Sequence, residues 1–130
     1  MAGDGGDWID PGSTALTRTI INSIITVHRV LGPGFVEAVY QRALIVELTK
    51  RRLPLATEVV VHVEYDGQPV GTHRLDLVVA GEIIVELKAV KALEEIHFAQ
   101  LKSYLKATQL RVGLLLNFNA PMLVVKRLVL

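Results

Sequence analysis

Three charged residues interrupt two strongly apolar runs near the middle of the chain: Asp76 lies in the first run, and Glu86 and Lys88 lie in the second. Gly81 separates the runs and predicts the turn of a β-hairpin. If that hairpin closes with a three-residue loop at 80–82, Asp76 is placed opposite Glu86. Residues two apart in a strand share a face, so Lys88 projects from the same side as Glu86. The sequence therefore predicts two carboxylates and one ammonium group clustered on an apolar hairpin.

Such a cluster needs a physical reason, because burying a charge without a partner costs roughly several kcal/mol. A divalent cation between the carboxylates is one reason, since Mg²⁺ accepts one or two carboxylates and keeps further positions for water and phosphate oxygens. A lysine beside the ion can orient or deprotonate an attacking water, or stabilise charge on a phosphoryl group. The other reading is an ion pair of Lys88 with Glu86 or Asp76 on a solvated face. The spacing alone leaves both alternatives open.

A second constellation, Gly34-x-x-Glu37-x-x-Tyr40, lies at the start of a helix that we expect over residues 36–52. The helix dipole favours an acidic side chain in the first turn, which explains Glu37 without a catalytic role. Tyr40 lies one turn later, where a core aromatic residue with a satisfied hydroxyl is the plain alternative. Among the histidines, His73 is close enough in sequence to reach the hairpin acids, although a structural role is the plainer expectation for each.

Hydrophobic periodicity predicts the elements that position these residues. Thr14 or Thr17 caps a first helix that ends before Gly32-Pro33-Gly34, and Asp66-Gly67 predicts a second hairpin turn. The first expected helix ends at residue 31, and two more cover 36–52 and 93–107. The expected strands cover 57–65, 70–79, 83–90, 111–117 and 122–130. Helices and strands in this order predict an α/β fold with a mixed central sheet.

Length and composition bound the rest. A chain of 130 residues predicts one domain, over 14–130, after a glycine- and aspartate-rich arm over 1–13 whose apolar anchor is Trp8. No apolar run approaches the roughly 20 residues of a membrane span, and the acidic N-terminus is unlike a signal peptide, so we expect a cytoplasmic protein with no membrane partner. Because 51% of the residues are hydrophobic, we also expect a homo-oligomer.

Several classes of function are excluded. The chain has no cysteine, which rules out disulfides, cysteine nucleophiles, thiolate zinc sites and iron–sulfur clusters. It has no phosphate-binding Walker loop and no dinucleotide-binding glycine motif, so no nucleotide cofactor is expected. The net charge of +1 gives no general attraction to nucleic acid, but residues 87–130 are locally basic, with seven Lys or Arg and two acids.

The motifs together resemble those of the GxxExxY family within the PD-(D/E)xK nuclease superfamily. The resemblance covers residues 20–130 and is carried by motifs in the same order and spacing. These are Gly34-x-x-Glu37-x-x-Tyr40, Asp76, Glu86-Leu87-Lys88, Gln100-Leu101-Lys102-Ser103-Tyr104 and Gly113-Leu114-Leu115-Leu116-Asn117-Phe118. One position departs from the pattern, because Leu75 stands where the superfamily name has a proline.

The resemblance implies a restriction-endonuclease-like fold and a role for each matching residue. Asp76 and Glu86 would bind the metal ion, Mg²⁺ or Mn²⁺, with the backbone carbonyl of Leu87 as a further ligand. Lys88 would be the catalytic lysine and Glu37 an additional acidic residue. Gln100 and Tyr104, one helical turn apart, would shape the same site.

These implications predict a metal-dependent nuclease that hydrolyses phosphodiester bonds in DNA, with RNA as the other possible substrate. Its phosphate contacts would come from Lys91, Lys102 and Lys106. The alternative is a catalytically silent nuclease-fold protein that acts as a self-assembling or nucleic-acid-binding module. The high apolar content and the apolar C-terminal strand favour that alternative, since such a strand can pair across a subunit edge.

Overall fold

A computed structural model describes residues 14–119 and 121–130, and the arm expected over 1–13 lies outside the described residues. Five strands form one mixed sheet in the order β1-β2-β3-β4-β5. Only β3 and β4 are parallel to each other; the other neighbours are antiparallel. Along the chain, the elements are α1 (Ala15–Leu31), α2 (Glu37–Lys50), β1 (Leu55–Tyr65), β2 (Gln68–Val79), β3 (Ile83–Lys88), α3 (Glu95–Thr108), β4 (Val112–Asn117) and β5 (Val124–Val129).

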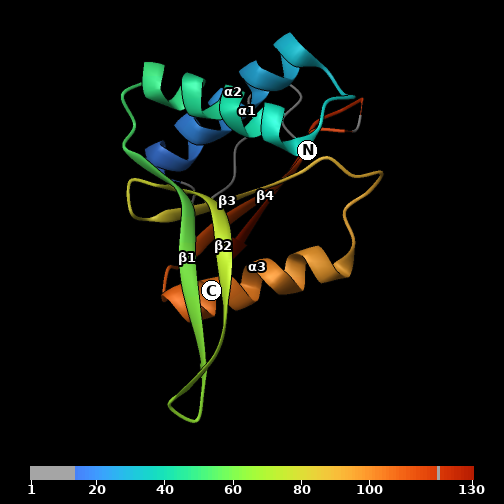
Figure 1. Ribbon diagram of the computed structural model, residues 1–130. Coiled ribbons are helices and arrows are strands. Elements are labelled where there is room, and N and C mark those ends of the chain that lie inside the picture. The colour runs from blue at the N-terminus through green and yellow to red at the C-terminus, as the bar shows by residue number, and fades with distance from the viewer. Residues whose placement is uncertain (1–13, 120) are drawn as a thin grey trace.

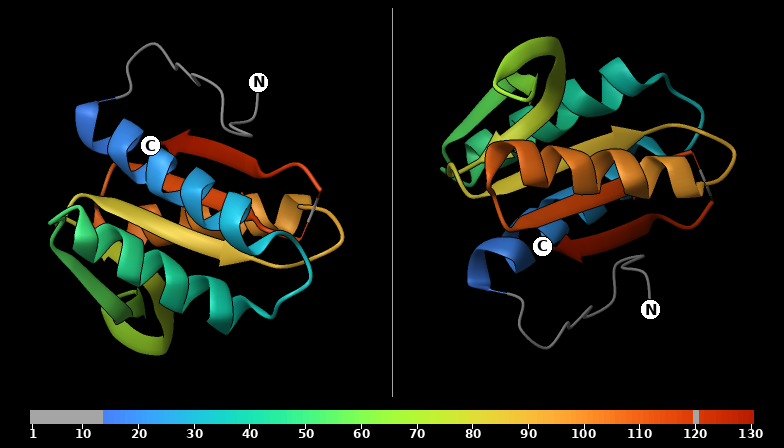
Figure 2. Two further views of the ribbon diagram at one scale, coloured as in Figure 1. Left: turned by 90° about the horizontal axis from the view of Figure 1, so that it is seen from above. Right: turned by 90° about the horizontal axis from the view of Figure 1, so that it is seen from below.

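Helices cover both faces of the sheet (Figures 1 and 2): α1 and α2 lie side by side on one face, and α3 lies alone on the other. The apolar side chains therefore divide into two cores. The larger core joins α1 and α2 to the sheet, and the smaller one lies under α3 around Leu101 and Leu105. Strand β4 is buried on both faces, as its nearly all-apolar sequence predicts. The predicted α/β architecture is confirmed.

The two predicted hairpin turns set the register of β1, β2 and β3. Ala80 and Gly81 both have positive φ, 54° and 66°, and the three-residue loop pairs Val79 with Ile83. At the other turn, Asp66-Gly67 connects β1 to β2 with Tyr65 paired to Gln68. Gly113 has a different role, because an added Cβ would lie 2.8 Å from the Leu101 side chain. The absence of a side chain there lets α3 pack closely on β4.

The ends of several elements differ from the predicted ones. Thr14 caps α1, as predicted, by accepting a hydrogen bond from the Thr17 N–H. Helix α2 is shorter than the predicted 36–52, and Val36, the first residue of the predicted helix, is 69% exposed at the N-cap. Strand β3 ends at Lys88 rather than at residue 90. At the start of α2 and at the end of β3, apolar residues continue the pattern of the element into a loop.

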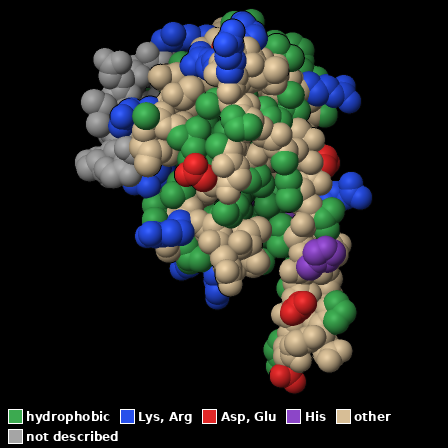
Figure 3. All heavy atoms as spheres, turned by 90° about the vertical axis from the view of Figure 1, so that its left-hand side faces the viewer, with side chains coloured by type: hydrophobic (Ala, Val, Ile, Leu, Met, Phe, Trp, Pro, Cys, Tyr) green, Lys and Arg blue, Asp and Glu red, His purple; other side chains and the backbone are tan. Residues whose placement is uncertain are grey.

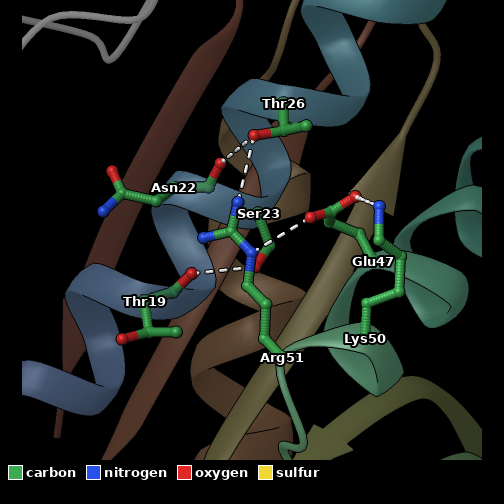
Figure 4. Close-up of polar contacts among 7 residues, drawn as sticks. All are labelled: Thr19, Asn22, Ser23, Thr26, Glu47, Lys50 and Arg51. Atoms are coloured by element: carbon green, nitrogen blue, oxygen red, sulfur yellow. Dashed lines mark hydrogen bonds and ion pairs between the residues drawn. The ribbon is translucent and has the colours of Figure 1, made fainter.

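Ionic and polar contacts join α2 to α1 (Figure 4). Arg51, just after α2, donates through Nε to Glu47 at 3.1 Å and through a terminal nitrogen to the Thr26 hydroxyl at 3.1 Å. Lys50 also pairs with Glu47, at 3.5 Å. The Glu47 carboxylate thus pairs with two cations at the end of α2, and Arg51 joins this cluster to α1.

The ribbon formed by β1 and β2 projects beyond the body of the molecule (Figures 1 and 3). Acidic side chains lie toward its tip, where Glu64 and Asp66 occur in the sequence.

No helix among residues 14–119 and 121–130 is long and apolar enough to cross a membrane.

Candidate active site

Asp76 and Glu86 lie opposite each other on β2 and β3, and each carboxylate bonds to the backbone of the other strand. The Asp76 N–H donates to Glu86 Oε2 at 2.8 Å, and the Leu87 N–H donates to Asp76 Oδ2 at 2.9 Å. These bonds continue the β2–β3 pairing beyond Leu77 and Val85, where the regular pairs end. The predicted juxtaposition of the two carboxylates is therefore present, with one oxygen of each held in place.

Burial makes this pair of carboxylates electrostatically unfavourable. Glu86 is only 5% exposed. Desolvation, followed by the negative charge of Asp76, raises the pKa of Glu86 to about 8. Desolvation also raises the pKa of Asp76, against the hydrogen bond from the Leu87 N–H, which lowers it. Near neutral pH the pair therefore holds a proton or requires a cation.

Lys88 does not supply that cation at contact distance. Within the described part of the chain it forms no ion pair within 4.0 Å with either carboxylate. Its charge nevertheless lowers the pKa of both Asp76 and Glu86, so it lies within electrostatic reach. The close ion pair that the sequence left open as an alternative is wrong for this structure.

An aromatic pair forms one wall of the site. The rings of His73 on β2 and Tyr104 on α3 stack with centroids 4.0 Å apart, and the Tyr104 hydroxyl lies 3.2 Å from His73 Nδ1. The other ring nitrogen of His73 is 3.9 Å from Glu86 Oε1. Burial, and then the charges of Glu86 and Asp76, raise the pKa of Tyr104. Tyr104 is therefore close to the carboxylates, and His73 lies between Tyr104 and Glu86.

Helix α2 brings Glu37 and Gln41 to the site from the opposite side of the sheet. Glu37 is exposed, and its charge raises the pKa of Asp76 and Glu86. One turn later, Gln41 Nε2 donates to the Asp76 carbonyl at 3.1 Å and to Glu58 Oε2 at 3.4 Å. Neither Gln41 nor Glu58 was predicted from the sequence. The four-residue spacing from Glu37 was a signal for Gln41, because it places both on one helix face.

Tyr40 does not reach the carboxylates. It is fully buried and stacks on Phe118 at a centroid distance of 4.5 Å, while its hydroxyl donates to the Gly32 carbonyl at 2.5 Å and accepts from the Phe35 N–H. These contacts fix the turn that precedes Glu37. The core interpretation of Tyr40 is confirmed.

Two further polar residues have structural roles near the site. His97 accepts a hydrogen bond from the Glu94 N–H and completes a capping box at the start of α3. Asn117 pairs with Lys88 in the sheet and bonds both backbone groups of Val90, at 2.9 and 3.1 Å. It holds the segment that follows Lys88. This contact joins residues 27 apart and was not predicted from the sequence.

The remaining predicted residues lie on the surface around the site. Gln100 is exposed one turn before Tyr104 on α3, and the described structure gives it no hydrogen bond to the carboxylates. Lys91 is exposed in the segment before α3, and Lys102 and Lys106 are exposed one turn apart on α3. Lys106 also lines a groove of about 630 Å³ between α3 and β1.

The donors present fit a hard divalent cation. No group of three or more His, Asp or Glu side chains within the described ranges forms a complete metal-binding set. Mg²⁺ does not need one, since it binds through one or two carboxylates and keeps several waters. Asp76 Oδ1 accepts no hydrogen bond from the described residues and is available as a ligand. The raised pKa of Glu86 is the second observation that favours a cation here.

Comparison with protein-family profiles matches residues 14–128 to the PD-(D/E)XK nuclease superfamily. Among solved structures, the crystal structure of SSO0001 is similar, with a TM-score of 0.57 and 20% sequence identity. The alignment covers 85% of this chain but only 55% of that protein, and at this identity the likeness supports the fold alone. No curated protein matches the sequence significantly. Since the family match spans most of the described residues, the chain belongs to the PD-(D/E)XK nuclease superfamily.

Proposed function

We propose that this protein is a metal-dependent nuclease that hydrolyses phosphodiester bonds in DNA. Membership of the nuclease superfamily supports a nucleic-acid substrate. The observation that carries the proposal is the buried Asp76–Glu86 pair, whose carboxylates face each other with no Lys or Arg at contact distance among the described residues; the nearest basic group in an ion-pair contact is the His73 ring, 3.9 Å from Glu86. A stable structural pair would be neutralised by a neighbouring Lys or Arg, as Glu47 is.

Asp76 and Glu86 would hold Mg²⁺ or Mn²⁺, with the Leu87 carbonyl as a further ligand and Glu37 assisting from the rim. When bound, the ion supplies positive charge that neutralises the phosphoryl oxygens of the substrate. The backbone N–H groups that anchor one oxygen of each carboxylate keep the ligands oriented. We also propose that the chain is a member of the GxxExxY family, on the basis of its Gly34-x-x-Glu37-x-x-Tyr40 segment.

Lys88 would orient the attacking water or stabilise charge on the phosphoryl group, because its ammonium is near the carboxylates and forms no ion pair with either of them. Gln100 and Tyr104 would shape the substrate side of the site. Lys91, Lys102 and Lys106 would contact phosphates, and the acidic side chains toward the tip of the β1–β2 ribbon disfavour phosphate contacts there.

A catalytically silent module that self-assembles or binds nucleic acid is the second candidate. It is favoured by β5, an edge strand among the described residues; its last residue, Val129, and the following Leu130 are 52% and 45% exposed. Such an edge can pair with a second copy of the chain. A homo-oligomer is compatible with either candidate, and it stays a prediction together with the cytoplasmic location.

Incubation of purified protein with supercoiled plasmid, single-stranded DNA and RNA in Mg²⁺ or Mn²⁺ tests the proposal. Wild type is compared with Glu86→Ala and Lys88→Ala, and Lys126→Ala on β5 serves as the matched control, since it is an exposed lysine on another strand. We expect cleavage by wild type and by the control, none by Glu86→Ala, and strongly reduced cleavage by Lys88→Ala. Absence of cleavage by wild type, or equal cleavage by all four proteins, would favour the silent module.

A further inference from the structure

The backbone is irregular where β1 passes Asp76. Glu58 has a φ of 51°, in the left-handed region that a glutamate in a strand rarely adopts. The register pairs Thr57 with Leu77 and Val59 with Leu75, and the intervening pair of Glu58 with Asp76 is missing. Strained backbone persists only where its surroundings hold it, and it concentrates at functional sites.

The partner strand is irregular at the same point. Leu75 packs in the core under α3, whereas Leu77 packs in the core under α1 and α2. Residues two apart in a regular strand share a face. The alternation of β2 is therefore interrupted at Asp76, and regular ladder bonds with β1 do not fix the position of this residue.

Side-chain hydrogen bonds hold the Asp76 backbone instead. The Asp76 N–H donates to Glu86, and the Asp76 carbonyl accepts from Gln41 at 3.1 Å. Gln41 lies on the same helix face as Glu37, one turn later. Among the described residues, this amide is thus the hydrogen-bonded link between Asp76 and the helix that carries Glu37.

Two acceptors, one of them on Glu58, face the Gln41 amide nitrogen. Both groups facing Nε2, the Asp76 carbonyl and the Glu58 carboxylate at 3.4 Å, are hydrogen-bond acceptors. An amide NH₂ has two donors for them, whereas the amide oxygen in its place would be repelled by both. The Glu58 carboxylate thus reaches this amide from the residue whose φ is 51°.

We propose that Gln41 is a positioning residue that holds Asp76 and Glu37 in register for cation binding, and that Glu58 orients the Gln41 amide. This role rests on the proposed metal-dependent function. Residues that hydrogen-bond to metal ligands typically contribute about 10–100-fold to metal affinity. Loss of the Gln41 amide is expected to weaken cation binding within that range.

Titration of the full chain with Mn²⁺, followed by electron paramagnetic resonance of the free ion, measures this affinity without reference to turnover. Gln41→Leu removes both hydrogen bonds at similar size, and we expect its Kd to rise about 10–100-fold. Gln68→Leu, at an exposed position of the β1–β2 ribbon, is the matched control and is expected to bind like wild type. Equal affinity of Gln41→Leu and wild type would overturn the positioning role.

Two variants of Glu58 separate orientation from charge. Glu58→Gln keeps an acceptor for Gln41, so we expect affinity close to wild type. Glu58→Gly removes the acceptor and relieves the positive φ, so we expect weaker Mn²⁺ binding together with a higher Tm. A purely structural residue would not move the two readouts in opposite directions. Equal losses in both variants would assign Glu58 a role through charge and overturn the orienting role.

The same titration distinguishes this inference from the function beneath it. If wild type binds no Mn²⁺, the metal-dependent function fails and the positioning role fails with it. If wild type binds Mn²⁺ and loses binding in Glu86→Gln but not in Gln41→Leu, only the positioning role fails.

Discussion

Glu47 and Glu86 are glutamates of similar exposure, with side chains 14% and 7% accessible, in opposite electrostatic surroundings. Glu47 accepts from Arg51 at 3.1 Å and pairs with Lys50 at 3.5 Å (Figure 4), and the Arg51 hydrogen bond holds its pKa below the ordinary value. Glu86 lies against Asp76, and burial followed by the Asp76 charge raises its pKa to about 8.

The difference distinguishes a structural carboxylate from the one that we propose binds a metal ion. At Glu47 the chain supplies its own cations, and the result is a link between α2 and α1. At Glu86, Lys88 lies two residues along the strand but outside ion-pair distance, and the backbone N–H groups hold carboxylates that retain a proton or take up a cation near neutral pH. The comparison predicts opposite responses of the two sites to substitution, pH and metal.

The largest expected difference is in turnover. Lys88→Ala should lower kcat about 10²–10³-fold, because the lysine stabilises charge in the transition state. Its Mn²⁺ affinity should stay close to that of wild type, because the lysine does not bind the ion. Lys50→Ala, at the Glu47 cluster, should leave kcat unchanged. Steady-state cleavage kinetics and Mn²⁺ titration of the same preparations measure both effects. Comparable loss of kcat in Lys50→Ala would show that the two sites are not functionally distinct.

The pH dependence of stability should have opposite signs at the two sites. In EDTA, the raised pKa of Glu86 means that folded protein retains a proton that unfolded protein releases near the ordinary value of 4.5. The free energy of unfolding should therefore fall between about pH 5 and 8, by on the order of 3 kcal/mol. For Glu47, with its lowered pKa, stabilisation is present above the unfolded value and is lost as the pH falls.

Urea unfolding of metal-free wild type and Glu86→Gln from pH 5 to 8 isolates this contribution. Glu86→Gln should be more stable than wild type at pH 8 and should lack most of the decline. A parallel decline in both proteins would place its cause elsewhere in the chain.

Divalent cations should stabilise the protein through one site only. At Mn²⁺ concentrations about 100 times Kd, linkage adds about 2.7 kcal/mol to the free energy of unfolding. Wild type and Glu47→Gln should show the corresponding rise in Tm, and Glu86→Gln should not. An equal rise in all three proteins would indicate binding away from the Asp76–Glu86 pair.

The smallest effect is expected at the ion-paired carboxylate. Glu47→Gln should lower the free energy of unfolding by less than about 1 kcal/mol, as is typical of ion pairs within one helix end. Urea unfolding at neutral pH measures it. A loss of several kcal/mol would mean that the link to α1 through Arg51 contributes more than its geometry suggests.

The hairpin half of the site was predictable from sequence because it depends on local geometry. A three-residue loop at Gly81 and the two-residue period of a strand place Asp76 opposite Glu86 without knowledge of the rest of the fold. The α/β order followed in the same way from periodicity and turn residues. The ends of α2 and β3 did not, because apolar residues such as Val36 continue the pattern into loops.

The supporting half of the site depends on contacts between distant segments. Gln41 reaches Asp76 across 35 positions, and Asn117 reaches Val90 across 27. The spacing from Glu37 places Gln41 on the same helix face, but it does not identify Asp76 as the partner, and no spacing pairs Asn117 with Val90. The positive φ of Glu58 occurs in a run with ordinary β-branched neighbours. The surroundings that raise the pKa of Glu86 likewise arise only when α2, α3 and the sheet come together.

The central claim is that Asp76 and Glu86 form a divalent-cation site, and calorimetric titration of Mn²⁺ at pH 7 in buffers of different ionisation enthalpy tests it most directly. Because the pKa of Glu86 is about 8 in the metal-free protein, binding should release about one proton per ion. Wild type and Glu47→Gln should bind with this proton release, and Glu86→Gln should bind weakly or not at all. Undiminished binding by Glu86→Gln, or binding by wild type without proton release, would contradict the claim.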